Sequence, residues 1–117
     1  MKVHDSELKV LEVLWANGPQ TAAELSRELK ESTGWSRNTT YTILKRCAAK
    51  SLIRRDEPHF LCTALVSRDE VRTSETDELI GRMFGGSRRQ FFSALIADER
   101  LSEAELEELR DMIDARR

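Results

Sequence analysis

The sequence has few of the residues from which metal and redox sites are usually built. It contains two cysteines, Cys47 and Cys62, and two histidines, His4 and His59, among 117 residues. No C-x-x-C pair occurs, so the usual spacing of a structural zinc site is absent. In a reducing compartment, two such cysteines are more typical of a hydrophobic core than of a disulfide. We therefore expect no metal, no cofactor and no disulfide.

Long apolar runs and catalytic signatures are missing as well. No stretch approaches the roughly 20 apolar residues of a membrane-spanning helix, and MKVHDSELKV lacks the apolar segment of a signal peptide. We expect a cytoplasmic protein without membrane insertion. No candidate nucleophile lies in a recognisable elbow motif, and no glycine-rich phosphate loop is present. The sequence therefore predicts a protein that is not an enzyme.

One further absence is local. Residues 32–55, STGWSRNTTYTILKRCAAKSLIRR, contain no acidic residue and six basic ones, whereas the whole chain has a net charge of −2. A cationic stretch in an acidic protein is typical of binding to a polyanion. Charge alone leaves an alternative open, namely a solvated helix face followed by a basic loop. The two parts of the chain also differ in net charge, which is +2 for residues 1–66 and −4 for residues 67–117.

The front part, residues 1–66, contains the periodic apolar pattern of three helices. The first follows Ser6 and ends at Asn17-Gly18-Pro19, and the second begins at the capping box Thr21-Ala22-Ala23-Glu24. The third spans residues 37–50 behind Ser36. The expected buried faces are Leu8, Leu11, Leu14 and Trp15 in the first helix, Ala22, Leu25 and Leu29 in the second, and Thr40, Ile43, Leu44 and Cys47 in the third.

The opposite face of the third helix carries short hydrogen-bonding and cationic side chains. Asn38, Thr42, Lys45 and Ala49 share this face, and it has no acid and no large aliphatic residue. A helix that enters the DNA major groove needs small polar groups for base edges and cations for phosphates. The alternative is a protein-interaction module without DNA binding, and such a module would tolerate acids or large apolar groups on this face.

A short hairpin follows the third helix. Leu52–Arg55 and Phe60–Ala64 read as strands, and residues 56–59 form the turn between them. Three helices followed by a hairpin is the order of a winged helix-turn-helix. The sequence therefore predicts a mostly α fold with a small β-hairpin, in which residues 1–66 form a DNA-binding domain.

The back part, residues 67–117, shows three amphipathic helices. They begin near residue 68, after Ser87 and after Ser102, and the first and last have capping boxes. A region this small buries too little apolar surface to be stable alone, so we expect a helical dimerisation domain and a homodimer. The predicted dimerisation residues are Val71, Leu79, Met83, Phe91, Phe92, Leu95, Ile96, Leu106, Leu109 and Ile113.

Five blocks of the sequence, in this order, resemble the penicillinase repressor family: LEVLWANGPQTAAEL, GWSRNTTYTILKR, ALVSRDE, MFGGS and LSEAELEELRDMI. The family includes the repressors of beta-lactamase and methicillin-resistance genes and copper-responsive relatives. The resemblance implies a winged-helix domain and a helical dimerisation domain. It also implies a homodimer that represses genes at double-stranded DNA operators with TACA/TGTA-type dyads. In many members, a membrane-bound zinc-metalloprotease sensor leads to cleavage of the repressor in its dimerisation region.

The resemblance also assigns residues. The family's recognition helix falls on residues 37–50, where Thr39, Thr42, Lys45 and Arg46 occupy recurring positions. Asn38 and Tyr41 stand where the family varies, so they are candidates for setting sequence preference. The full predicted DNA-binding set is Arg37, Asn38, Thr39, Tyr41, Thr42, Lys45, Arg46, Lys50, Arg54 and His59.

The chain departs from the family pattern in three places. The wing tip, Asp56-Glu57-Pro58-His59, is short and lacks the usual glycine, which leaves His59 as its one polar candidate donor to phosphate. The usual Asn-Phe cleavage bond is replaced by Ala94-Leu95, so proteolytic induction by the known route has no support here. The C-terminal cysteine motif of the copper-responsive relatives is absent, which argues against release by copper.

Overall fold

The computed structural model describes residues 1–97 and 99–117. The described chain contains six helices and one three-stranded antiparallel sheet, and it divides into two compact units, Met1–Glu75 and Thr76–Arg117. The predicted class, mostly helical with a small sheet, is confirmed. Among the described residues, no helix is both long enough and apolar enough to cross a bilayer.

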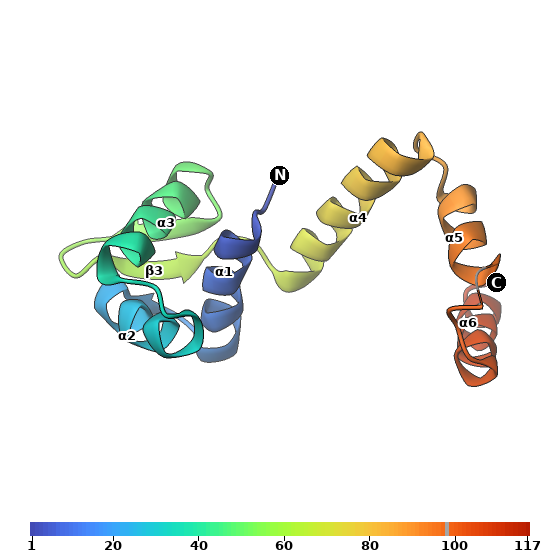
Figure 1. Cartoon of the computed structure of the whole chain (residues 1–117), viewed down its shortest axis with the longest axis horizontal. Helices are drawn as coiled ribbons and strands as arrows, with labels where there is room; N and C mark the ends of the chain where they lie inside the picture. The colour runs from blue at the N-terminus through green and yellow to red at the C-terminus, as the bar shows by residue number, and fades with distance from the viewer. Residues whose placement is uncertain (98) are drawn as a thin grey trace. The chain divides into compact units, whose positions relative to one another are not determined.

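The N-terminal unit has the element order of a winged helix (Figure 1). Its elements are α1 Asp5–Asn17, β1 Gln20–Thr21, α2 Ala22–Thr33, α3 Arg37–Ala49, β2 Ile53–Asp56 and β3 Leu61–Ala64. The central strand is β3, which pairs with β2 on one edge and with the two-residue β1 on the other. The hairpin was predicted, whereas β1 was not.

The core of this unit lies between the three helices and the sheet. The predicted inner face of α3 is confirmed, because Thr40, Ile43, Leu44 and Cys47 are all buried. The remaining buried apolar side chains come from α1, α2, the hairpin with its flanking residues and the start of α4: Val10, Leu11, Leu14, Ala22, Leu25, Leu29, Leu52, Ile53, Phe60, Cys62 and Val71.

The first helix differs from its prediction at its start. It begins at Asp5 rather than after Ser6, because the Glu7 carboxylate accepts a hydrogen bond of 2.9 Å from the backbone N–H of His4. The buried side chains of α1 are Glu7, Val10, Leu11 and Leu14, and the expected Leu8 and Trp15 are only half-buried. The buried face thus begins with a carboxylate.

The long helix α4, Arg68–Phe84, contributes its first two turns to the N-terminal unit. Val71 is 4% exposed there and belongs to the core, which corrects its prediction as a dimerisation residue. The Val3 N–H donates to Glu75 Oε1 at 2.8 Å, and Ser74 Oγ donates to the Met1 carbonyl at 3.1 Å. The compact unit therefore extends beyond residue 66, where the sequence placed the domain boundary.

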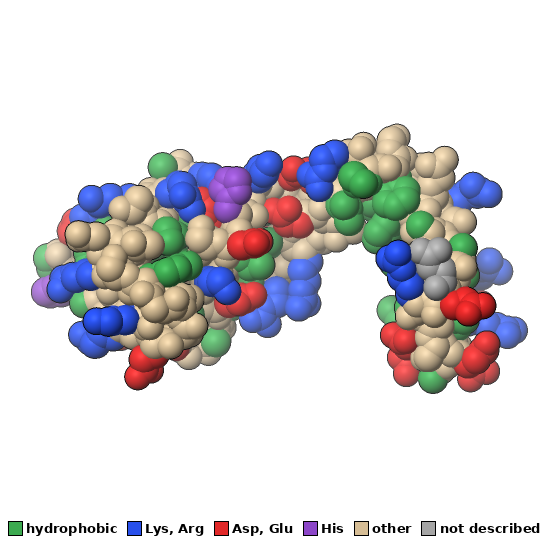
Figure 2. All heavy atoms as spheres, in the orientation of Figure 1, with side chains coloured by type: hydrophobic (Ala, Val, Ile, Leu, Met, Phe, Trp, Pro, Cys, Tyr) green, Lys and Arg blue, Asp and Glu red, His purple; other side chains and the backbone are tan. Residues whose placement is uncertain are grey.

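The C-terminal unit consists of the rest of α4, α5 Arg88–Ala97 and α6 Glu103–Ala115. Phe91 packs edge-to-face on Phe84 at 5.6 Å and on Phe92 at 5.5 Å between ring centroids. In this unit Figure 2 shows hydrophobic side chains gathered at the surface where α4 meets α5. Its large exposed apolar residues are Leu79, Met83, Phe92, Ile96, Met112 and Ile113.

Candidate nucleic-acid interface

The helix α3 is held by a tight connection to α2. Gly34 ends α2 in the left-handed conformation, with φ +79°, and Ser36 caps α3 by accepting a hydrogen bond of 3.1 Å from the Thr39 N–H. Because the inner face of α3 is fully committed to the core, its opposite face is fixed outward. This is the geometry of a helix-turn-helix.

The outward face of α3 has the composition that the sequence predicted. Asn38, Thr39, Thr42 and Lys45 are exposed. The Thr42 hydroxyl donates to the Asn38 carbonyl at 2.9 Å, which leaves its oxygen lone pairs available as acceptors. A shallow depression of about 500 Å³ runs along this face, lined by Ser6, Trp35, Asn38, Thr39, Thr42, Ile43 and Arg46.

Tyr41 lies at the edge of this face and links α3 to the hairpin. It is half-buried and meets Phe60 edge-to-face at 5.8 Å between ring centroids. The Arg37 guanidinium lies 5.1 Å from the centre of the Tyr41 ring and donates to its hydroxyl at 3.1 Å. Tyr41 therefore supports the position of Arg37 as well as the hairpin tip, and its predicted contact with bases remains a prediction.

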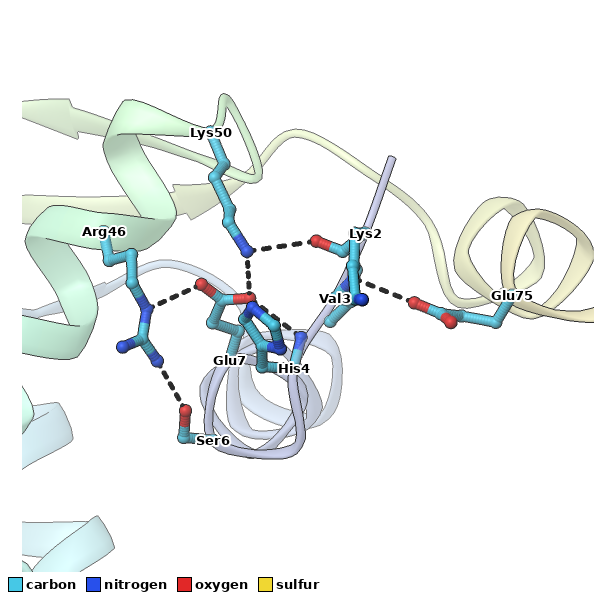
Figure 3. Close-up of polar contacts among 8 residues, drawn as sticks. All are labelled: Lys2, Val3, His4, Ser6, Glu7, Arg46, Lys50 and Glu75. Carbon is cyan, nitrogen blue, oxygen red and sulfur yellow. Dashed lines mark hydrogen bonds and ion pairs between the residues drawn. The ribbon is translucent and has the colours of Figure 1, made fainter. Parts of the chain in front are cut away.

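Two predicted phosphate contacts, Arg46 and Lys50, are held by a buried carboxylate (Figure 3). Arg46 Nε lies 2.8 Å from Glu7 Oε2, and Lys50 Nζ lies 2.7 Å from Glu7 Oε1. Burial alone would raise the pKa of Glu7, but hydrogen bonds from Lys50, the His4 backbone and Arg46 together lower the pKa below its ordinary value. Glu7 thus stays ionised while it is fully buried.

The sequence reasoning missed Glu7, although a signal was present. Glu7 lies four positions before Leu11, on the buried face of α1. An ionised residue on such a face requires an opposite charge or several hydrogen bonds, because an unpaired buried carboxylate is costly. The two basic residues at the end of α3 supply that charge.

The two arginines of the wing, the hairpin of β2 and β3, both pair with acidic residues of the same hairpin. Arg54 Nε lies 2.9 Å from Asp56 Oδ2, and Arg55 pairs with Glu57 while its guanidinium lies 3.7 Å from the centre of the Phe60 ring. His59 is exposed at the turn. Of the six cations in residues 32–55, only Arg37 and Lys45 make no ion pair within the described part of the chain.

The two cysteines are buried, free thiols in the core behind α3 and β3. Burial raises the pKa of Cys47 to about 12, with the Glu7 charge adding to the effect, and burial raises the pKa of Cys62 to about 11. Both thiols therefore stay protonated at neutral pH, which suits packing rather than chemistry. In the described ranges, no cluster of three or more His, Cys, Asp or Glu residues could hold a metal ion.

Comparisons of the sequence with known proteins identify a family and similar members of it. The sequence model of a family described as penicillinase repressor matches residues 3–115. The methicillin resistance regulatory protein MecI of Staphylococcus aureus is 23% identical over 97% of this chain and 94% of its own length. The penicillinase repressor of Bacillus licheniformis is 22% identical over 97% of this chain and 90% of its own length.

Two solved structures resemble the N-terminal part of the chain. The solution structure of the DNA-binding domain of the repressor BlaI has a TM-score of 0.55 and 25% identity, covering 59% of this chain and 87% of that one. Monomeric Bacillus licheniformis BlaI in complex with the blaP half-operator has a TM-score of 0.52 and 25% identity, covering 60% and 88%. The winged-helix assignment of this part is thereby confirmed.

Proposed function

Since the chain belongs to the penicillinase repressor family and is a DNA-binding transcriptional repressor, we propose that it acts as a homodimer on a dyad operator. Each subunit places α3 in a major groove of the operator. The observation that carries this proposal is the outward face of α3, which presents Asn38, Thr42 and Lys45 without any acid. The half-operator complex of BlaI supports it, because that protein, in its monomeric form, is bound there to half of an operator.

The side chains of α3 divide by chemistry. Asn38 and Thr42 are short and exposed, and their amide and hydroxyl groups suit base edges in the groove. Lys45 is an exposed cation without an ion pair among the described residues, which suits a phosphate. Thr39 and Arg37 lie in the first turn, where free amides also favour a phosphate. The ion pairs of Arg46, Lys50 and Arg54 constrain the contacts that these cations can make with phosphates. His59, which is exposed at the wing tip, adds a weaker contact.

The homodimer rests on the C-terminal unit. Met83, Phe92, Ile96 and Ile113 are each more than half exposed, although all are large and apolar. Exposed apolar side chains concentrated in one small unit mark a protein-binding surface. Two-fold pairing is the commonest oligomer and matches the symmetry of a dyad site. The same proposed dimerisation region includes four half-buried residues: Phe91, Leu95, Leu106 and Leu109.

The family resemblance suggests the operator class and the setting. We propose a TACA/TGTA-type dyad and a cytoplasmic protein, with a membrane sensor-protease as the candidate source of the inducing signal. The bond that would be cut aligns with Ala94-Leu95, in α5. Incubation with such a protease, followed by mass spectrometry, tests this point, and an intact α5 would count against proteolytic induction.

A selection from random DNA duplexes tests the proposed function. The wild-type protein should enrich a two-fold symmetric sequence, and binding should weaken steeply with salt. Lys45→Ala should weaken binding to every duplex and flatten the salt slope, whereas Asn38→Ala should change the preferred sequence. Equal loss on every sequence for Asn38→Ala would contradict a base-reading role. Failure to enrich any sequence would favour the protein-interaction module instead.

A further inference from the structure

The Glu7 carboxylate connects two segments that are distant in the sequence, the start of α1 and the end of α3. Its Oε1 accepts from the His4 N–H at 2.9 Å and from Lys50 Nζ at 2.7 Å, and its Oε2 accepts from Arg46 Nε at 2.8 Å. Arg46 also donates to Ser6 Oγ at 2.7 Å, and Lys50 donates to the Lys2 carbonyl at 3.2 Å. The start of α1 therefore holds both cations at the end of α3 (Figure 3).

Both cations remain in reach of solvent. The Arg46 side chain is 44% exposed and the Lys50 side chain 31%, whereas Glu7 is fully buried. Arg46 lines the depression on the outward face of α3, together with Ser6 and Asn38. The carboxylate thus acts from behind the interface, and it leaves part of each cation facing outward.

Stability alone gives a weak reason for this arrangement. A buried ion pair loses much of its Coulombic gain to desolvation, and well-packed apolar residues often replace it without loss. The buried carboxylate has two clear electrostatic effects instead. It reduces the charge of the Arg46–Lys50 pair from +2 to +1, and it restricts the positions that the two flexible side chains can occupy.

We propose that Glu7 is a positioning residue of the DNA interface, which fixes Arg46 and Lys50 and lowers non-specific affinity for DNA. A cation held in one place contributes fully only where a phosphate meets it, whereas a mobile cation can follow any phosphate. Pre-organisation thereby favours a correctly docked operator over other sequences. The smaller charge reduces the number of counterions released on any duplex. This inference rests on the proposed DNA-binding function.

The salt dependence of binding distinguishes positioning from a structural role. Glu7→Gln removes the negative charge and keeps the size of the side chain, so it returns one positive charge to each subunit. The slope of log Kobs against log salt on a non-operator duplex should steepen by about 0.9 per subunit, or about 1.8 per dimer. Raising salt from 50 to 200 mM should then weaken the variant about 12 times more than the wild type.

The experiment uses full-length protein, a duplex selected from random sequence by the wild type, and a scrambled duplex of the same composition. Binding is measured by fluorescence anisotropy at 10 °C, with folding checked by circular dichroism at each salt concentration. For Glu7→Gln, the added charge should strengthen binding to both duplexes at low salt. The ratio of selected to scrambled affinity should fall, because the released Arg46 and Lys50 can then reach phosphates of the scrambled duplex that they do not meet when Glu7 fixes them.

Glu12→Gln is the matched control. Glu12 is an exposed carboxylate on the same helix, and it makes no ion pair with the described residues. This variant changes the net charge equally and should leave the slope unchanged. The double variant Glu7→Gln/Lys50→Gln restores the charge of the cluster and should return the slope to the wild-type value.

Parallel slopes for the wild type and Glu7→Gln would overturn the proposal, and so would the same shift in Glu12→Gln. Failure of both Glu7 variants to fold at 10 °C would assign Glu7 to stability and also overturn it. Absence of salt-dependent DNA binding by the wild type would instead defeat the proposed function itself, so the two failures are distinguishable.

Discussion

The replacement Ile96→Ala should weaken the proposed dimer by an amount that follows from its exposure. The Ile96 residue is 54% exposed in one copy of the chain, and the substitution removes three carbons. At about 0.8 kcal/mol per buried methylene, covering the exposed part of these carbons contributes about 1.3 kcal/mol per copy. A two-fold interface contains the residue twice, which gives about 2.6 kcal/mol and about an 80-fold higher dimer Kd.

Sedimentation equilibrium over a range of protein concentrations measures this Kd directly. Leu65→Ala is the matched control, because Leu65 is 47% exposed and loses the same three carbons, but it lies in the N-terminal unit. The control should dimerise as the wild type does. If both variants keep the wild-type Kd, Ile96 lies outside the interface; equal weakening by both would refute the assignment of dimerisation to the C-terminal unit.

Three further outcomes are expected. The pKa of Glu7 in the folded state lies below its ordinary value of 4.5. The ionised Glu7 therefore stabilises the fold above pH 4.5, and this stabilisation is lost as the pH falls through the lower folded pKa. Urea unfolding from pH 7 to 3 should show the loss in the wild type and not in Glu7→Gln. A fragment of residues 1–75 should be folded, and it should be monomeric in sedimentation. It should also melt at a higher temperature than a fragment of residues 1–66, because the shorter fragment lacks Val71, whose burial stabilises the fold by about 1.5–3 kcal/mol. Gly34→Ala should cost about 1 kcal/mol in chemical unfolding, because residue 34 has a φ of +79°.

The sequence predicted those features that depend on neighbours along the chain. The two faces of α3 follow from its helical period, and the caps at Ser36 and Ser102 follow from local hydrogen bonding. The wing pairs Arg54–Asp56 and Arg55–Glu57 are also local, since their partners are two positions apart and, for Arg54 and Asp56, lie on one face of β2. They could have been read from the sequence, and they were missed.

The features that the sequence did not predict depend on distant partners. The strand β1 has only two residues and exists through its pairing with β3. Glu7 bonds Arg46 and Lys50, which lie 39 and 43 positions further along the chain. Val71 was assigned to a dimer face because the predicted boundary at residue 66 put its whole helix in the C-terminal part, but the start of α4 packs on the N-terminal core. A single sequence does not show which of two cores a shared helix serves.

The ion pairs also determine how strongly one subunit alone can hold DNA. Within the described residues, Arg37 and Lys45 are unpaired, the Glu7 cluster contributes one net charge, and the wing pairs contribute none. About three phosphate contacts per subunit predict a slope near −2.7, and two subunits predict about −5.4. Raising salt from 50 to 200 mM should then weaken the fragment 1–75 about 40-fold and the dimer about 1,800-fold. Equal slopes for the fragment and the full chain, measured on one duplex, would show that only one subunit contacts DNA.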